Sequence, residues 1–188
     1  MTLIVIIKIL AIIILLLLSA LSSGSETALT AVSKQRAHRQ KDKGAKNANF
    51  ILKIKEFKDE FITGILLANN LFNILATALM TELLVSEFGG LGVSVATIFM
   101  TLMIVIFSEV TPKIFAINKP MTFALKVSKF FYFYTKLIKP IVNLINKVSN
   151  KIIKLIGLNL NADQSKIIEE EFEGAVQLQK QYSKDGEY

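Results

Sequence analysis

Three apolar stretches of this chain carry serine, asparagine and glutamate residues, which are costly to bury in hydrocarbon. The candidate site residues are Ser19, Ser23, Asn69, Asn70, Asn73 and Glu109. Ser19 and Ser23 are four residues apart, so they share one face of a helix. Asn69 and Asn73 have the same spacing, with Asn70 displaced by about 100°. One carboxylate among neutral hydroxyl and amide oxygens is a ligand set for a hard cation, Mg²⁺ or Na⁺.

A proline near the end of the third stretch should open the helix beside the glutamate. Pro112 lacks an N–H group and clashes with the carbonyl four residues earlier, which belongs to Ser108. Thr111, the residue before the proline, is expected to leave helical geometry. The freed Ser108 carbonyl would add an oxygen beside Glu109, as in the broken helices where transporters bind ions.

A purely structural role for these polar groups is the competing interpretation. Asn and Ser on membrane helices often only hydrogen-bond to a neighbouring helix, which contributes about 0.6–2 kcal/mol each. Glu109 could also lie at the membrane surface with Lys113 as its partner. The cation site is favoured because polar residues converge from three helices and no basic residue lies deep in the spans to neutralise Glu109.

Composition narrows the class of protein and the chemistry. The chain has 188 residues, is 52% hydrophobic and has a mean hydropathy of +0.50, too apolar for an ordinary soluble domain of this size. It contains no Cys and one histidine, His38, so thiolate or histidine metal sites and a His-dependent triad are not expected. Neither paired intramembrane aspartates nor a Ser/Lys dyad is apparent, which disfavours an intramembrane enzyme.

The hydrophobic runs predict an all-α membrane protein with three transmembrane helices plus cytoplasmic juxtamembrane amphipathic helices. The spans are expected at about residues 3–25, 61–81 and 88–109. An uncharged run of 21 residues covers roughly 30 Å, the thickness of the hydrocarbon layer. The run Leu3–Leu21 also resembles a cleaved signal peptide, but residues 23–29 continue in a helical pattern, which favours a retained span. Residues 26–58 should form two short helices joined near Gly44, and residues 82–92 a short turn.

Positive charge is concentrated between the first two spans. Residues 33–58 contain nine Lys or Arg and two acids, whereas residues 82–92 contain two glutamates and no base. A net charge of +7 can indicate nucleic-acid binding, but a basic cluster between two spans is better explained by the positive-inside rule, and no nucleic-acid partner is expected. That rule places residues 33–58 in the cytoplasm and the N-terminus and the 82–92 turn outside.

Residues 121–158 are hydrophobic but contain a lysine every three to eight positions, and Pro140 is expected to interrupt the helix. A lysine at the bilayer centre costs roughly 2.5–3.5 kcal/mol. The segment therefore predicts interfacial helices on the cytoplasmic face, with aromatic side chains inward and lysines toward anionic lipid headgroups. A fourth span with snorkelling lysines is the alternative. Residues 161–188 are acidic and predict a cytoplasmic helix or tail that could dock on the basic segment.

Three motifs in this sequence resemble those of a known family. Residues 22–29 (SSGSETAL), 69–74 (NNLFNI) and 108–113 (SEVTPK) are similar, in order and approximate spacing, to signature segments of the CNNM/CorC magnesium transporters. Members of that family commonly show a glycine just before the glutamate. This chain has Ser108 there, so exposure of the carbonyl depends more heavily on Pro112.

The resemblance covers about residues 1–160, the cyclin-M-like transmembrane domain. It implies a homodimer with three spans per subunit, in a bacterial or archaeal plasma membrane, that exports Mg²⁺ with Na⁺ as the expected coupling ion. It assigns the cation ligands to Ser19, Ser23, Asn69, Asn73 and Glu109, with Asn70 and Ser25 as additional candidates. The paired CBS modules that usually follow in the family are absent from these 188 residues, so regulation by nucleotide is not assigned to this chain.

A second function remains open at this point. The chain could be a membrane anchor or ion-sensing module that binds a cation structurally and presents its cytoplasmic helices to a partner. In that case, ion binding should stabilise the protein without any flux of ions, whereas a transporter shows both.

Overall fold

The structure is a computed structural model that describes residues 2–156, and every regular element in that range is helical. In chain order the elements are α1 (Thr2–Ala31), α2 (Lys34–Asp42), α3 (Ala48–Glu56), α4 (Lys58–Phe88), α5 (Leu91–Met103), the π-helix η1 (Ile104–Val110), α6 (Thr111–Asn118) and α7 (Pro120–Leu155). Residues 1–143 form one compact unit, and α7 continues into a second unit that begins at Leu144. The predicted acidic tail, 161–188, lies outside the described residues.

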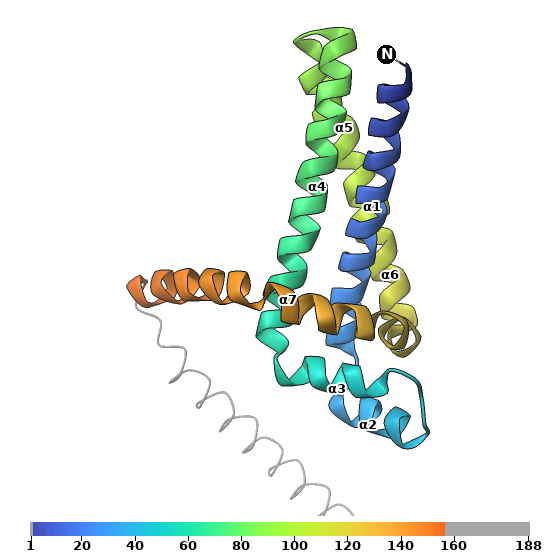
Figure 1. Cartoon of the computed structure of the whole chain (residues 1–188), viewed down its shortest axis with the longest axis vertical. Coiled ribbons are helices and arrows are strands. Elements are labelled where there is room, and N and C mark those ends of the chain that lie inside the picture. The colour runs from blue at the N-terminus through green and yellow to red at the C-terminus, as the bar shows by residue number, and fades with distance from the viewer. Residues whose placement is uncertain (1, 157–188) are drawn as a thin grey trace, which may run out of the picture. The chain divides into compact units, whose positions relative to one another are not determined.

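Three helical segments of the described chain are long and apolar enough to cross a membrane. They are Leu3–Ala31, Lys58–Phe88 and Leu91–Asn118, the last made of α5, η1 and α6. The three segments run side by side in the first unit (Figure 1). The predicted class, an all-α membrane protein with three spans, is therefore confirmed. Each helix is longer than its predicted span because the backbone hydrogen bonds of a helix continue past the apolar run into amphipathic residues.

The turn between α4 and α5 is shorter than predicted. The expected turn over residues 82–92 is wrong, because α4 continues to Phe88 and only Gly89 and Gly90 separate it from α5. Gly89 has φ +59° and ψ −140°, a conformation that other residues rarely adopt. A Cβ atom on Gly92 would overlap the carbonyl of Leu84, so α5 can pass this close to α4 only because residue 92 has no side chain.

We expect Gly92→Ala to destabilise this hairpin, and Gly90→Ala to be nearly neutral. The new methyl group at residue 92 meets rigid backbone, and overpacking of this kind costs about 1–3 kcal/mol. Gly90 has φ −59° and open space around the position of a Cβ atom. Thermal unfolding of both variants in detergent measures the difference. Equal melting temperatures would show that the close approach at Gly92 does not matter for stability.

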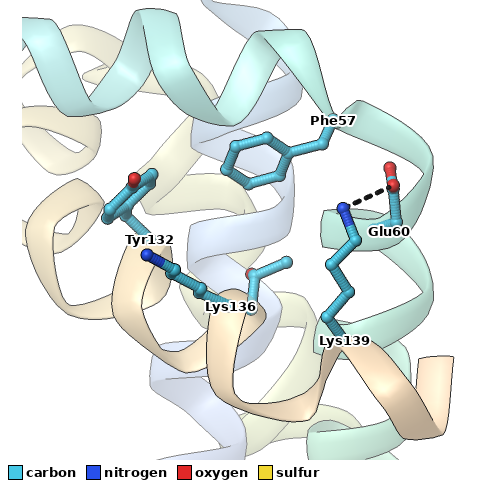
Figure 2. Close-up of a pocket in the computed structure, with 6 residues that line it drawn as sticks. Phe57, Glu60, Tyr132, Lys136 and Lys139 are labelled. Carbon is cyan, nitrogen blue, oxygen red and sulfur yellow. Dashed lines mark ion pairs between the residues drawn. The ribbon is translucent and has the colours of Figure 1, made fainter. Parts of the chain in front are cut away.

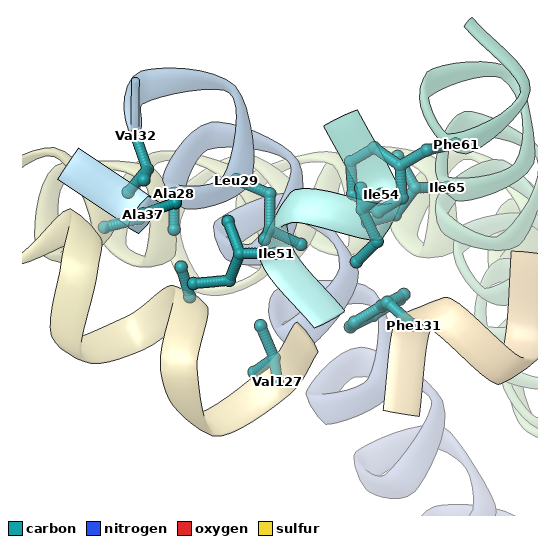
Figure 3. Close-up of a cluster of buried hydrophobic side chains, with 12 residues drawn as sticks. Ala28, Leu29, Val32, Ala37, Ile51, Ile54, Phe61, Ile65, Val127 and Phe131 are labelled. Carbon is teal, nitrogen blue, oxygen red and sulfur yellow. The ribbon is translucent and has the colours of Figure 1, made fainter. Parts of the chain in front are cut away.

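The basic segment forms two short helices, α2 and α3, joined near Gly44 as predicted. Gly44 has φ +72°, and Ser33 caps α2 by accepting a hydrogen bond from the Arg36 N–H at 3.3 Å. Both helices contribute to the larger hydrophobic core, which also includes the adjoining ends of the spans and α7 (Figure 3). Its buried members are Ala28, Leu29, Val32, Ala37, Ile51, Ile54, Phe61, Ile65, Ala116, Ala124, Val127 and Phe131.

Lys55 of α3 is partly buried beside this core, and its Nζ donates to the Thr30 carbonyl at 3.2 Å. Burial lowers the pKa of Lys55, and repulsion from Lys58 and Lys34 adds to the effect.

The helix α7 is a single element, so the predicted interruption at Pro140 is wrong. Packing on both sides of the proline explains its continuity. A Cβ atom on Gly64 would lie 2.7 Å from Ile138 Cδ1 and 3.6 Å from Val142 Cγ2, so α7 packs closely on α4 before and after Pro140. The Tyr134 hydroxyl also donates to the Gly64 carbonyl at 3.2 Å. Among the described helices, α7 is not one of the three that are long and apolar enough to cross a membrane.

The aromatic run of α7 does not pack into the protein core as a whole. Phe131 is 2% exposed, whereas Phe130 and Phe133 are 58% and 54% exposed. Phe131 therefore packs into the protein core, and the orientation of the exposed Phe130 and Phe133 relative to a membrane stays a prediction. Five consecutive residues cover every side of a helix, so they cannot all reach one core.

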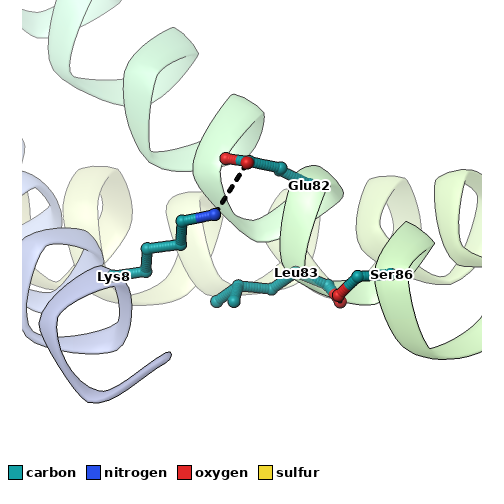
Figure 4. Close-up of polar contacts among 4 residues, drawn as sticks. All are labelled: Lys8, Glu82, Leu83 and Ser86. Atoms are coloured by element: carbon teal, nitrogen blue, oxygen red, sulfur yellow. Dashed lines mark hydrogen bonds and ion pairs between the residues drawn. The ribbon is translucent and has the colours of Figure 1, made fainter. Parts of the chain in front are cut away.

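Two ion pairs tie α4 to its neighbours within residues 2–156. Near the α4–α5 turn, Lys8 Nζ lies 2.7 Å from Glu82 Oε1 and links α1 to α4 (Figure 4). At the other end of α4, Lys139 Nζ of α7 lies 3.5 Å from Glu60 Oε1, beside a cavity of about 190 Å³ (Figure 2). Lys8 is the one charged residue within the apolar run Leu3–Leu21, and Glu82 compensates its charge.

Candidate metal centre

The structure brings together three of the predicted site residues midway along α1 and α4. Ser19 Oγ lies 2.6 Å from Asn69 Oδ1 and 2.6 Å from Asn73 Oδ1. Ser19 is fully buried, and both asparagines are partly buried. We call these three residues the Ser19 cluster.

The Ser19 cluster has more acceptor oxygens than protons. A serine hydroxyl carries one proton, so it can donate to only one of the two amide oxygens that lie 2.6 Å away. The other amide oxygen then faces a lone pair of Ser19 Oγ, which is repulsive. A cation among the three oxygens would replace that repulsion with attraction. The neutral alternative is rotation of one amide, so that its Nδ2 donates to Ser19 Oγ.

Ser23, one turn after Ser19, holds a buried hydroxyl without a hydrogen-bond partner. It is 1% exposed, and its Oγ is the one buried side-chain polar atom without a partner in the described part of the chain. The hydroxyls of Ser22 and Ser25 instead donate to the Leu18 and Leu21 carbonyls, at 2.9 and 2.6 Å. An unpaired buried polar group costs about 1–3 kcal/mol, so Ser23 Oγ is available to a ligand in a way that Ser25 is not.

Gly24 lets the third span and α7 approach this turn of α1. A Cβ atom on Gly24 would lie 3.3 Å from the Pro112 carbonyl oxygen and 2.9 Å from Phe123 Cζ. Earlier along α1, the Ser108 hydroxyl donates to the Leu16 carbonyl at 3.1 Å. These contacts hold η1 and α6 against the serine-bearing part of α1.

The third span widens before Pro112 and does not break. Thr111 has φ −60° and ψ −47°, so the prediction that it leaves helical geometry is wrong. The chain instead forms the π-helix η1, and the Thr111 N–H donates to the Ile106 carbonyl five residues earlier. A π turn is wider than an α turn, which accommodates the proline ring while the neighbouring residues stay helical.

This widening leaves a backbone carbonyl without its helical donors. The Phe107 carbonyl would accept from Thr111 in an α-helix and from Pro112 in a π-helix. The Thr111 N–H is bound to Ile106, and Pro112 has no N–H. The Ser108 carbonyl, singled out from the sequence, loses its α-helical donor for the same reason. Sequence analysis missed Phe107, because only the π register of η1 reveals it.

Glu109 lies in η1, half-buried, immediately after buried Ser108. Neither ion pair of residues 2–156 includes it, so the structure does not support Lys113 as its partner. No hydrogen bond joins it to the Ser19 cluster within the same residues. Asn70 is exposed and also lies outside the cluster. The structure thus gathers Ser19, Asn69 and Asn73, with Ser23 one turn away.

Within residues 2–156, few charged side chains are available to bind a metal ion near the Ser19 cluster. The described residues contain no group of three or more His, Cys, Asp or Glu side chains that could hold a metal ion. Any cation at the Ser19 cluster would therefore be held mainly by neutral oxygens. Such a ligand set suits an ion that has exchanged water for hydroxyl and amide oxygens.

A polar stripe along α4, which sequence analysis also missed, continues from the Ser19 cluster. Asn73, Thr77 and Thr81 line a groove of about 700 Å³ together with Glu82. The Thr77 and Thr81 hydroxyls each donate to the carbonyl four residues earlier, at 2.8 Å, which leaves their oxygen lone pairs free to accept. The four-residue spacing that relates Asn69 to Asn73 continues to Thr77 and Thr81, so this signal was present in the sequence.

A comparison with known families matches residues 10–186 to the family model described as the cyclin M transmembrane N-terminal domain. This match covers nearly the whole chain, including all six candidate site residues.

Curated relatives share the same region. A UPF0053 protein of Haemophilus influenzae is 33% identical over 152 residues, which cover 81% of this chain and 36% of that protein. The UPF0053 inner membrane protein YfjD of Escherichia coli is 31% identical over 134 residues, 71% of this chain and 31% of the relative. A putative DUF21 domain-containing chloroplast protein of Arabidopsis thaliana is 31% identical over 134 residues, 71% of this chain and 20% of its own length. The chain spans about a third of the two bacterial relatives.

Proposed function

Because the chain belongs to the cyclin M transmembrane N-terminal domain family, we propose that it transports Mg²⁺ across a membrane through the site between α1, α4 and η1. The observation that carries this proposal is the Ser19 cluster, where one hydroxyl proton serves two amide oxygens at 2.6 Å. Three oxygens with one proton between them are a partial coordination shell for a hard cation.

Two further groups would complete the site. Ser23 Oγ, buried and without a partner, adds a fourth neutral oxygen one turn along α1. Glu109 adds the negative charge that a divalent ion needs, and the widened turn before Pro112 leaves the Phe107 carbonyl without helical donors. Mg²⁺ prefers six oxygens at about 2.0–2.1 Å, so bound water would supply the remaining ligands.

The orientation of the protein in the membrane, its oligomeric state and its coupling ion are part of the same proposal. We propose that the α2–α3 end is cytoplasmic, because its lysines and arginines follow the positive-inside rule, and that the N-terminus and the α4–α5 turn are outside. The transporter then works as a homodimer in a bacterial or archaeal plasma membrane, and Na⁺ entry drives Mg²⁺ export. Anionic lipid headgroups interact with the basic helices on the cytoplasmic side.

An anchor or ion-sensing module is the second candidate function. It is favoured by a cavity of about 240 Å³ on the basic helices, lined by Arg36, Arg39, Gln40, Lys43 and Met121. Such a surface could hold an acidic partner, with a cation in the membrane domain serving stability alone. Flux and thermal stabilisation by Mg²⁺, measured on one sample, separate this function from transport.

We expect Asn69→Ala and Asn73→Ala to reduce Mg²⁺ flux in proteoliposomes by about tenfold or more each. Loss of a ligand oxygen worth about 1.4 kcal/mol weakens binding tenfold. The thermal stabilisation given by Mg²⁺ should fall in the same variants. Asn70→Ala is the matched control, because Asn70 is exposed and outside the Ser19 cluster.

Three patterns distinguish the interpretations of this experiment. Reduced flux in the two cluster variants, with normal flux in Asn70→Ala, supports transport through the site. Stabilisation by Mg²⁺ without flux in the unmodified protein supports the anchor or sensor. Unchanged flux and unchanged stabilisation in both cluster variants would refute a cation site at the Ser19 cluster.

A further inference from the structure

One face of α7 combines lysines with exposed apolar side chains. Lys126, Lys129, Phe130, Phe133 and Leu137 follow the three- and four-residue spacing of a single helix face. Phe130, Phe133 and Leu137 are 58%, 54% and 79% exposed. Large apolar side chains in such a contiguous row mark a surface that is covered by something other than water.

These five residues line a groove of about 590 Å³, together with Asn47 and Tyr134. The wall at Asn47 is fixed by two hydrogen bonds to α7. Asn47 Nδ2 donates to the Leu125 carbonyl at 3.0 Å, and the Ser128 hydroxyl donates to the Asn47 carbonyl at 3.2 Å. The groove is therefore part of the packed structure and does not depend on a loose loop.

The groove lies where apolar span residues meet the basic helices. Phe130 and Tyr134 also line a small cavity of about 80 Å³ with span residues, among them Leu18 of α1 and Phe72 of α4. On the other side, the ring of Phe133 lies 6.0 Å from that of Phe50 in the basic helix α3. A ligand in the groove would thus contact an apolar wall on one side and polar helices on the other.

The two lysines of the groove are not neutralised by acids. Neither Lys126 nor Lys129 belongs to an ion pair within the described chain, and no acidic residue lines the groove. Lys139, farther along the same helix, is paired with Glu60. The groove therefore presents two free ammonium groups next to an apolar floor. A phosphodiester attached to acyl chains matches both features, because lysines bind phosphate and the aromatic floor binds hydrocarbon.

We propose that this groove is a binding site for one anionic phospholipid. Lys126 and Lys129 hold the headgroup phosphate, and the acyl chain lies along Phe130, Phe133 and Leu137. This assignment goes beyond cation transport and does not depend on it, since it requires only that the three spans lie in a bilayer. Free phosphate would satisfy the lysines but leave the apolar floor uncovered, so the lipid is the occupant we assign.

A tryptophan reporter tests the site, because the chain contains no Trp of its own. The full chain with Phe133→Trp is placed in nanodiscs of mixed phosphatidylglycerol and phosphatidylcholine, with one lipid brominated on its acyl chains at a time. At equal mole fractions, brominated phosphatidylglycerol should quench the reporter more than brominated phosphatidylcholine does. The difference should correspond to an enrichment of about five- to twenty-five-fold near the reporter, since each of the two lysines contributes about fivefold at an anionic surface. Added glycerol phosphate should not reverse the quenching.

Two matched double variants on the reporter background locate the effect. Lys126→Gln with Lys129→Gln should make quenching by the two lipids equal. Lys147→Gln with Lys151→Gln removes the same charge from exposed positions of the same helix and should leave the preference intact. Thermal unfolding of each variant confirms that it is folded.

Four results would overturn the proposal. Equal quenching by both lipids in the reporter protein would show that the groove does not select an anionic lipid. A reporter quenched by neither lipid would show that protein, such as a second copy of the chain, covers the groove. Equal loss of preference in both double variants would show a general charge effect. Reversal of the quenching by glycerol phosphate would identify the phosphate group alone as the ligand.

Discussion

Replacing Glu109 with glutamine is expected to reduce Mg²⁺ flux at least about a hundredfold while the three-span fold persists. Glutamine keeps the size of the side chain and one oxygen but removes the charge. At an effective dielectric constant of about 20, two unit charges 4 Å apart attract by about 4 kcal/mol, so a divalent ion loses at least that much when the carboxylate is neutralised. Flux into proteoliposomes and thermal stabilisation by Mg²⁺ measure this loss.

Unlike Glu109, two of the acids near the ends of α4 have a basic partner. Glu82 is paired with Lys8 and Glu60 with Lys139, so their charges are already compensated. Glu87→Gln, at an exposed position near the α4–α5 turn, removes one carboxylate without touching the candidate site and serves as the control. If Glu109→Gln transported as well as Glu87→Gln does, Glu109 would have no part in moving the ion.

Pro112→Ala should raise thermal stability and slow transport by about tenfold or more. Alanine is up to about 3 kcal/mol more favourable than proline inside a helix. The wide turn of η1 already relieves part of that cost, and the greater freedom of the unfolded chain offsets about 0.4–1 kcal/mol more of the gain. The restored N–H can donate to the Phe107 or Ser108 carbonyl, which favours an α-helix in place of η1. Conversion to an α-helix would rotate Glu109 relative to α6. It would also give the Phe107 carbonyl, which the wide turn leaves without a donor, a hydrogen bond from the Thr111 N–H.

Pro140→Ala provides the comparison for this variant. Pro140 also lies inside a helix, but in α7, away from the candidate site. It should gain stability in the same way and transport normally. Paired measurements of melting temperature and flux on the two proline variants therefore separate helix stability from the geometry of η1. Wild-type flux in Pro112→Ala would show that the π-helix is not needed for transport.

The features visible in the sequence are those set by local pattern. Three apolar runs, two of them uncharged and the first interrupted only by Lys8, were sufficient to predict three spans. Gly44 between two short amphipathic stretches was sufficient for α2 and α3. The spacing of Asn69 and Asn73 placed both on one helix face. Their contact with Ser19 was a hypothesis about which faces meet, and the structure shows that contact at 2.6 Å.

The features that the sequence did not predict depend on packing between helices. Pro140 was expected to interrupt α7, but contacts of Ile138 and Val142 with α4 keep the helix continuous. Thr111 was expected to leave helical geometry, but η1 absorbs the proline by widening. Nothing in the sequence indicates that Gly92 is required. Only the position of the Leu84 carbonyl shows that a side chain at residue 92 would overlap the backbone of α4.

Crystals grown with Mn²⁺ in place of Mg²⁺ would locate the cation through its anomalous scattering. We expect a peak between α1, α4 and η1, within about 2.0–2.3 Å of the Asn69 and Asn73 amide oxygens and bound to the Glu109 carboxylate directly or through water. A map without a peak there, in which one amide has rotated to donate to Ser19 Oγ and Glu109 pairs with Lys113, would mean that these polar groups only hold helices together.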